Sequence, residues 1–509
     1  MLNKINNFEV NNKSYIMPTT EKIAIVWFKR DLRLHDNEAI YNAIKSGYSI
    51  LFIYIFEPSM LADEHYSERH WNFIKQSITD INNQLEHYKT RVLAVTSEVI
   101  PFFSYLQSQK KIAQVFSHQE TGIMRTFKRD KEFKRFCNNN SIDWVENVNN
   151  GVFRGRKNRD HWKEDWEAYM QEPLFEFNPK EASCFINHSE IDKIAKNVTI
   201  ENLNTVQSSV FQPGGRVYGM KYLQSFLKDR HKNYQKFISK PNEARESCSR
   251  LSPYIAWGNL SVREIYQSAK EYSLGNSNLN KKSLQAFITR LRWQAHFIQK
   301  FEMECIMESE SINKGYRKLK KEIAQHYQQA WKEGNTGIPI IDACMRCLQV
   351  TGYLNFRMRA MVVSFFTHNL WQPWQDASKF LSKVFLDFEP GVHFPQLQMQ
   401  AGETGINMLR IYNPIKNSLE HDPDATFIKK WVPELKNLES PFAHEPYLMT
   451  ELEQQFYEFQ LGQDYPYPIV DFDSTRKKAS DTLWQMRNKK LVKEESLRIL
   501  KKHSSRNKS

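Results

Sequence analysis

The sequence predicts two domains: an α/β domain with a doubly wound parallel sheet, followed by a domain that is nearly all α-helical. Within the first 150 residues, short continuous apolar runs alternate with helical patterns, as in parallel sheets covered on both faces. After about residue 213, apolar residues recur at helical spacing and few strand signals appear. The length of 509 residues also exceeds what one ordinary core accommodates.

Four apolar runs rich in β-branched and aromatic residues are the expected strands. Residues 23–28 (IAIVWF) and 50–56 (ILFIYIF) are the clearest, and residues 92–95 and 112–117 continue the alternation. We therefore place the α/β domain at residues 21–150. No G-x-G-x-x-G motif follows the first run, so an ordinary dinucleotide site is not expected there.

The remaining chain divides into a connector and a helical domain. Residues 151–212 are weakly periodic and carry scattered proline, asparagine and charge, so we expect an inter-domain connection on the surface. From residue 213 onward the spacing is helical, with Tyr218, Tyr222 and Phe226 on one face. The helical domain is expected to span residues 213–475.

Both ends of the chain are polar. Residues 1–20 are rich in asparagine and lack the apolar core of a secretory signal, so we expect a disordered lead-in. No apolar run is long enough to span a membrane, which favours a cytoplasmic protein. The net charge of +13 suits an anionic partner. Part of it lies in a basic tail, residues 476–509, which has the alternative interpretation of a solvated, partly disordered extension.

The six cysteines do not predict a disulfide framework in an intracellular chain. Cys344 and Cys347 have C-x-x-C spacing, but they lie in an apolar helical pattern and no second pair accompanies them. Buried small hydrophobic side chains are the favoured interpretation, and we predict no metal site.

Several motifs follow one another along the chain and are more specific together than alone. They are VWFKRDLRLHDN at residues 26–37, SRLSPY at 249–254, RLRW at 290–293, GIPIIDA at 337–343, TGYLNFRMR at 351–359 and RIYNP at 410–414. The ordered set resembles the photolyase/cryptochrome family over roughly residues 22 to 475. The resemblance implies that the helical domain binds FAD. It also implies a possible antenna chromophore, a folate, deazaflavin or flavin, in the α/β domain.

The resemblance assigns FAD contacts to two groups of residues. The phosphates are held by Tyr234 and a segment before a helix start, although a plain helix cap by Ser252 would also explain that segment. The paired Arg359 and Asp387 lie beside the flavin ring in the family, and Glu389 replaces the usual second aspartate. The complete expected set is Tyr234, Cys248, Ser249, Arg250, Leu251, Ser252, Arg359, Asp387, Phe388 and Glu389.

Two positions near the flavin depart from the family pattern. Family members often place an asparagine opposite flavin N5, where this chain has His393 or Phe394. His393 would donate a hydrogen bond or gate protonation there, or it is a structural histidine. The tryptophan that usually reduces the flavin is missing, since none lies between Trp374, which matches the family's middle tryptophan, and Trp431. Photoreduction would then need another path, with Trp371 or Tyr412 as candidates.

Residues that would contact the substrate also differ from the family pattern. Arg290 replaces a glutamate that contacts the flipped dimer in common photolyases, and it precedes Trp293 by one helical turn. Phe356 replaces an asparagine beside Arg357. From the resemblance we expect Arg290, Trp293 and His393 to be catalytic. The expected contacts to DNA are Arg290, Trp293, Gln294, Phe356 and Arg357.

In the α/β domain, Lys29, Asp31 and Arg33 follow the first strand, where open sheets bind ligands. In the family this segment mainly joins the two domains. Arg125, Lys128 and Arg129 are expected to be solvated helix charges rather than DNA contacts. One branch of the family holds an iron–sulfur cluster with late cysteines, and because this chain has none after Cys347 we predict no cluster.

Three functions agree with these observations. The first is light-driven repair of pyrimidine dimers, with UV-damaged DNA as the partner of a monomeric enzyme. The second is a cryptochrome-type photoreceptor without repair activity, which the altered substrate residues favour. The third is a flavin-bearing binder of single-stranded or other nucleic acid, which the basic charge permits.

Overall fold

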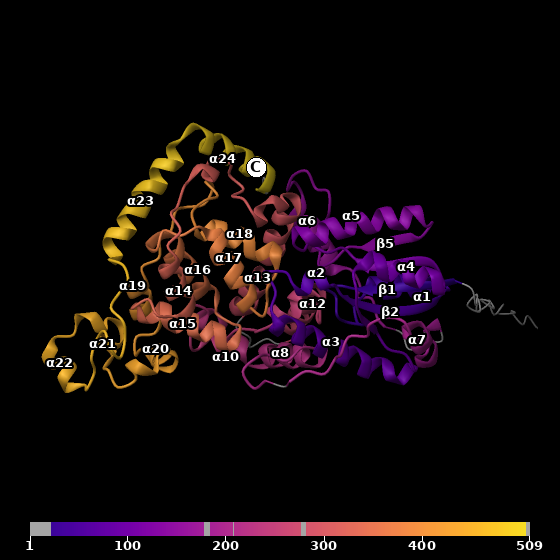
Figure 1. Ribbon diagram of the computed structural model, residues 1–509, viewed down its shortest axis with the longest axis horizontal. Helices are drawn as coiled ribbons and strands as arrows, with labels where there is room; N and C mark the ends of the chain where they lie inside the picture. The colour runs from indigo at the N-terminus through magenta and orange to yellow at the C-terminus, as the bar shows by residue number, and fades with distance from the viewer. Residues whose placement is uncertain (1–21, 178–183, 207, 276–280, 505–509) are drawn as a thin grey trace, which may run out of the picture.

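The computed structural model describes residues 22–177, 184–206, 208–275 and 281–504. It has an α/β domain at one end and a larger helical domain at the other (Figure 1). The predicted fold class is confirmed. The predicted disordered lead-in, residues 1–20, lies outside the described residues. Within the described part of the chain, no helix has the length and apolar character needed to cross a membrane.

The α/β domain is built on a five-stranded parallel sheet with the strand order β3-β2-β1-β4-β5. Alternate residues of β1 point to opposite faces, so that Ile25 and Trp27 join one apolar cluster while Val26 and Phe28 join the other. Helices α4 and α5 cover the first face, and α1 and α3 cover the second. The strands are β1 Lys22–Phe28, β2 Ser49–Phe56, β3 Leu93–Thr96, β4 Lys111–His118 and β5 Asp143–Asn147. The four predicted strands are confirmed, and β5 is an edge strand that the apolar pattern did not indicate.

The helices between the strands follow the expected alternation. They are α1 Glu38–Lys45, α2 Pro58–Leu61, α3 Glu68–Leu85, η1 Glu86–Tyr88, α4 Val99–Gln109 and α5 Met124–Asn139.

The described part of the connector includes the helices α6 Trp162–Gln171 and α7 His188–Ala195. Ile191 and Ile194 of α7 are buried in the apolar cluster on one face of the sheet. Phe185 forms a bridge to Ile50 at the start of β2. This part of the connector therefore completes the α/β domain, because its apolar side chains cover sheet surface that earlier helices leave open.

The helical domain begins after Gly214, where the chain passes very close to α3. A side chain on Gly214 would place its Cβ 2.1 Å from the Phe73 carbonyl oxygen, which is why glycine is needed there. The helices of this domain up to α18 include α8 Arg216–Lys228, η3 Arg230–Asn233, α9 Tyr234–Phe237, α10 Ala244–Ser247, α11 Ser252–Ala256, α12 Val262–Gly275, α13 Lys281–Met303, α15 Pro339–Thr351, α16 Phe356–Ser364, the π-helix η6 Phe365–Asn369, α17 Trp374–Val384 and α18 Pro390–Gln400. The others are η4 Cys305–Glu308, η5 Tyr316–Lys318, α14 Gln325–Glu333, α19 Pro414–His421, α20 Thr426–Trp431, η7 Pro433–Leu435, α21 Ser440–His444, η8 Pro446–Leu448 and α22 Glu451–Phe456.

The expected basic tail is folded. It forms α23 Phe472–Asn488 and α24 Lys490–His503, which run along the outer edge of the helical domain (Figure 1). Arg498 Nη1 lies 2.6 Å and Lys502 Nζ 2.9 Å from Glu304 Oε1. The interpretation of this segment as a partly disordered extension is therefore wrong for residues 476–504, because buried apolar side chains and these ion pairs hold both helices in place.

The segment after β1 joins the two domains, as the resemblance implied. Arg30 stacks 4.4 Å over the Trp257 ring, and its Nε donates to the Ala256 carbonyl at 3.0 Å. Arg33 Nη1 donates to the Gly258 carbonyl at 3.1 Å. These cations bind backbone oxygens, which fixes the α/β domain against the turn after α11.

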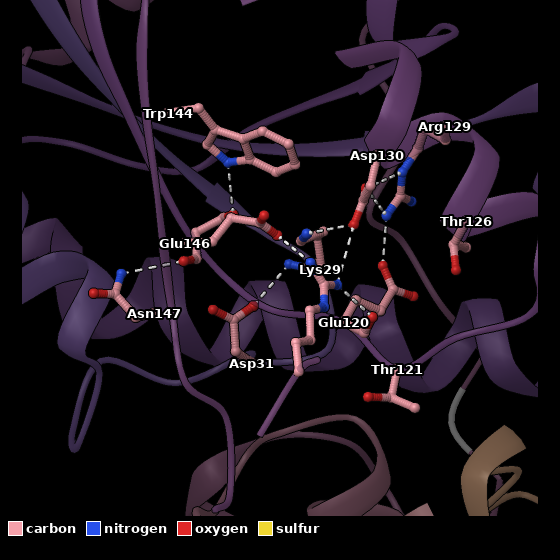
Figure 2. A network of polar contacts seen from close by, with 12 residues as sticks. Lys29, Asp31, Glu120, Thr121, Thr126, Arg129, Asp130, Trp144, Glu146 and Asn147 are labelled. Atoms are coloured by element: carbon pink, nitrogen blue, oxygen red, sulfur yellow. Dashed lines mark hydrogen bonds and ion pairs between the residues drawn. The ribbon is translucent and has the colours of Figure 1, made fainter. Parts of the chain in front are cut away.

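A buried ion network fills the carboxyl ends of β1 and β4, where the strand order reverses (Figure 2). Arg129 donates to Glu57 at 2.7 Å, to Glu120 at 2.6 Å and to Asp130 at 2.8 Å. Lys29 Nζ lies 3.3 Å from Asp130. Arg129 is therefore not the solvated charge that the sequence suggested. Open α/β sheets bind ligands at this position, and here these side chains leave only a small cavity of about 40 Å³.

Candidate flavin and DNA site

The helical domain encloses a cavity of about 330 Å³, and most of the predicted site residues line it. The side chains come from the segments around α9 to α11, from α13, from the loop before α16, and from α16 to α18. The predicted residues that line the cavity are Tyr234, Cys248, Ser249, Arg250, Leu251, Ser252, Arg290, Gln294, Phe356, Arg359, Asp387, Phe388, Glu389 and His393. Residues separated by up to 159 positions in the chain thus meet around one space.

The other predicted residues lie outside this lining. Trp293 is 49% exposed, and its ring packs against His296 on the outer face of α13. Arg357 turns toward Ser239, with 3.4 Å between Nη2 and Oγ. Both are thus surface residues next to the cavity rather than part of its wall.

The segment before α11 has a special backbone. Arg250 has a left-handed conformation with φ of 59°, and its guanidinium lies 3.8 Å over the Tyr353 ring. Leu251 occupies the N-cap position and makes no side-chain cap bond, so capping by Ser252 does not explain the segment. The conformation turns Arg250 inward, where Nη2 donates to Gln212 Oε1 at 2.8 Å.

Arg359 and Asp387 form the ion pair that the sequence predicted. Arg359 Nη2 lies 2.8 Å from Asp387 Oδ2, and the guanidinium stacks 4.0 Å over the Phe385 ring. Burial alone would raise the pKa of Asp387, but Arg359 and a hydrogen bond from Ser252 hold the pKa of that carboxyl below its usual range. The carboxylate is therefore ionised at neutral pH, and it keeps Arg359 at the cavity wall.

Of the two candidates for the position opposite flavin N5, only His393 lines the cavity. Phe394 is fully buried and stacks on Phe301 instead. His393 Nε2 lies 3.1 Å from both the carbonyl oxygen and Oγ of Ser378. Burial lowers the pKa of His393 to about 3, so the ring is neutral at neutral pH. Because a carbonyl only accepts, Nε2 carries the proton, and Nδ1 is an acceptor rather than the donor that we expected.

The tryptophans do not reach the cavity. Among the described residues that line it, none is a tryptophan, and Leu397 and Gln400 of α18 are present instead. Trp374 is fully buried and its Nε1 donates to Ser311 Oγ at 3.3 Å. Trp371 has a left-handed backbone, with φ of 54°, and Lys321 Nζ lies 4.8 Å from its ring.

Sequence reasoning missed several polar residues of the cavity wall. Gln396 and Gln400 line it one helical turn apart on α18, and Tyr353 and Asn355 line it from the loop before α16. The helical spacing from His393 to Gln396 and Gln400 was a signal that could have found the first pair.

Comparisons with known proteins find photolyases or cryptochromes in each case. Residues 24–156 match the family model described as DNA photolyase, and residues 287–485 match the model described as the FAD binding domain of DNA photolyase. A deoxyribodipyrimidine photo-lyase of Alkalihalophilus pseudofirmus is 28% identical over 91% of this chain and 98% of its own length. A cryptochrome DASH of Synechocystis is also 28% identical, over 88% of this chain and 95% of its own length. The crystal structure of a Synechocystis cryptochrome covers 91% of this chain and 100% of its own with a TM-score of 0.80 at 24% identity, which shows the fold.

The cavity wall fits an FAD molecule. Arg250 Nε, Asn355 Oδ1, Asp387 Oδ1 and Gln396 Oε1 are buried and have no hydrogen-bond partner among the described residues. Buried polar atoms are normally bonded, so this set indicates a ligand that carries both donors and acceptors. A flavin nucleotide carries both donors and acceptors. Its flat ring would pack against the apolar part of the wall, which includes Leu397 and Phe388. Over the same described part of the chain, no cluster of three or more metal-binding side chains occurs.

Proposed function

Because the chain belongs to the photolyase/cryptochrome family and carries its FAD-binding domain, we propose that it repairs UV-induced pyrimidine dimers in DNA by light-driven electron transfer. The activity would be that of a deoxyribodipyrimidine photo-lyase, a carbon–carbon lyase. The observation that carries the proposal is the rim of the cavity. There Arg290 and Phe356 are exposed, with 5.9 Å between the guanidinium and the ring, beside the half-exposed Trp293. A cation beside partly exposed aromatic rings suits a nucleobase and its phosphate.

Reduced FAD, when bound, supplies the electron that splits the dimer after it absorbs light. The protein would hold a flipped dimer in the cavity, as base-flipping enzymes do. Phe356 and Trp293 would stack on the dimer and its neighbours, and Arg290, Gln294 and Arg357 would bind phosphate or base oxygens.

The inner wall would act on the flavin. Arg359, fixed by Asp387, places positive charge at the cavity and favours a negatively charged ring. Neutral His393 would accept a hydrogen bond from the ring through Nδ1, and it would not act as an acid. Neither Trp374 nor Trp371 lines the cavity, so an electron from either ring would have to cross intervening side chains to reach the flavin.

The partners and surroundings follow from the same proposal. We expect UV-damaged DNA as the partner, a monomer, and a cytoplasmic location. An antenna chromophore, a folate, deazaflavin or flavin, would have to bind away from the carboxyl ends of β1 and β4, because Arg129 and its carboxylates fill that position. The absence of an iron–sulfur cluster stays a prediction.

A cryptochrome-type photoreceptor is the second candidate. Two observations favour it: Arg290 stands where a dimer-binding carboxylate is expected, and no tryptophan is among the described residues that line the cavity. Both would weaken repair while leaving light absorption intact.

One experiment separates the two candidates. The purified protein is reduced chemically in the dark, which bypasses the electron relay, and is then mixed with UV-irradiated oligonucleotide under blue light. Light-dependent loss of dimers establishes repair, whereas full flavin occupancy without loss of any photoproduct refutes repair and favours the receptor. Phe356→Ala is expected to reduce DNA binding about tenfold, since base stacking contributes about 1–3 kcal/mol. Phe456→Ala, which removes a 79% exposed ring on α22, is the matched control.

A further inference from the structure

A second, smaller cavity lies where the two domains meet. Its volume is about 40 Å³, and it is lined by Arg30, Gln119 and Asn149 from the α/β side and by Ala256 and Glu389 from the helical side. Ala256 and Glu389 also line the large cavity. The side chain of Glu389 therefore separates the flavin site from the space between the domains.

This small cavity is polar and incompletely bonded. Arg30 Nη1, Gln119 Oε1 and Asn149 Oδ1 are all buried, and none has a hydrogen-bond partner within the described part of the chain. One donor and two acceptors around a common space match the hydrogen-bonding capacity of water. A water molecule takes roughly 30 Å³ in the liquid and needs two to four polar partners, so the cavity has the room and the groups to bind at least one.

Glu389 has the character of a proton-exchanging group. Its Oε2 lies 3.7 Å from Arg30 Nη2, which is too long for a strong hydrogen bond. Burial raises the pKa of Glu389, Arg30 opposes the shift, and the negative charges of Glu120 and Asp387 add to it. Glu120 is held in the ion network by Arg129 (Figure 2), so its charge is fixed close to the small cavity.

We propose that the small cavity holds water and that Glu389 exchanges protons through it between the flavin site and the domain junction. In the outward direction the Glu389 O–H bond breaks as the water takes that proton, and the water passes one of its own protons to the Glu120 carboxylate, which also lines this cavity. The reverse transfer restores the acid, and no electron moves. The inference goes beyond the proposed function: it needs only the cavity at the domain junction, and it holds for a lyase and for a receptor alike.

Infrared spectroscopy of the full-length protein with its flavin tests the path. The carboxylic acid C=O band of Glu389 is identified by its loss in Glu389→Gln. After mixing with D2O, the shift of this band reports how fast the proton exchanges. Gln119→Leu keeps the side-chain size but places apolar atoms in the cavity, and it should slow the exchange about tenfold or more because a proton does not cross an apolar gap. Gln114→Leu, which removes an exposed amide that binds Asp143, should not slow it.

Equal exchange rates in wild type and Gln119→Leu would overturn the proposal, as would a Glu389 that shows no acid band at any pH where the protein is folded. Unchanged circular dichroism and flavin absorbance confirm that each variant is folded. A crystal structure of the unmodified protein at high resolution provides a second measurement. Ordered water bonded to Gln119 and Asn149 supports the path, and a dry cavity contradicts it.

Discussion

Gly258 holds the two domains at close range, and replacing it by alanine should loosen them. Its φ is +76°, a conformation that L side chains rarely adopt. An added Cβ would lie 2.3 Å from the Arg30 carbonyl oxygen and 2.4 Å from the Asp31 Cα. Both of these atoms belong to the backbone, so neither can move aside alone. The Gly258 carbonyl also accepts the bond from Arg33, so any shift disturbs that contact too.

The size of the effect follows from a matched pair of glycines. Gly47 has nearly the same φ, +73°, but nothing lies within 4 Å of an added Cβ. Gly47→Ala should therefore cost only the left-handed strain, about 1–2 kcal/mol. Gly258→Ala carries the same strain and also the overlap with backbone atoms, for which overpacking values suggest about 1–3 kcal/mol more.

Thermal unfolding of the two variants, followed by tryptophan fluorescence and by flavin release, measures the difference. For a domain of this size, about 1 kcal/mol corresponds to roughly 2–4 °C in the unfolding midpoint. We expect the unfolding midpoint of Gly258→Ala to fall further than that of Gly47→Ala. Gly258→Ala should also release its flavin at a lower temperature than Gly47→Ala. Equal losses in the two variants would refute the close approach at Gly258, because strain alone would then explain both.

Three further predictions concern the site and the C-terminal helices. Asp387→Asn removes the partner of Arg359, and because charged hydrogen bonds contribute about 1.5–3 kcal/mol, flavin affinity should fall by roughly tenfold or more in a fluorescence release assay. Burial alone would raise the pKa of Glu304, but His503, Arg498 and Lys502 on α24 hold it below its usual range. The contribution of Glu304 to stability should therefore be present above the ordinary carboxyl range near pH 4.3 and be lost as pH falls below it, and unfolding midpoints of Glu304→Gln should lack this pH dependence. Trp374→Phe should leave photoreduction of the flavin almost unchanged, because the residue does not line the cavity, and a large loss measured by absorbance would show that it relays electrons.

The local patterns of the chain were sufficient for much of the fold. The strands at residues 23–28 and 50–56 could be predicted because a parallel strand covered on both faces needs a continuous apolar run. The edge strand β5 could not, since Asp143 and Glu146 interrupt its apolar pattern. The basic residues of α23 and α24 also concealed an apolar face, with Leu483 and Val492 buried.

Some residues of the candidate site could likewise be predicted from the sequence, and others could not. Ordered motifs identified Arg359 and Asp387 as a pair although 28 positions separate them, and the structure brings them to 2.8 Å. The roles of these residues stay proposals. Gln396 and Gln400 were missed, although their helical spacing from His393 indicates that they share its side of α18.

By itself, the sequence determined the two-domain class, the periodicities of the strands and helices, and the family motifs, since these depend on residues that are near in the chain or recur in a fixed order. Only the tertiary structure decided that His393 rather than Phe394 faces the cavity, that Arg129 is buried among carboxylates, and that Glu389 lies between two cavities. The reason is physical. Burial and charge pairing depend on which distant segments pack together, and a local pattern does not contain that information.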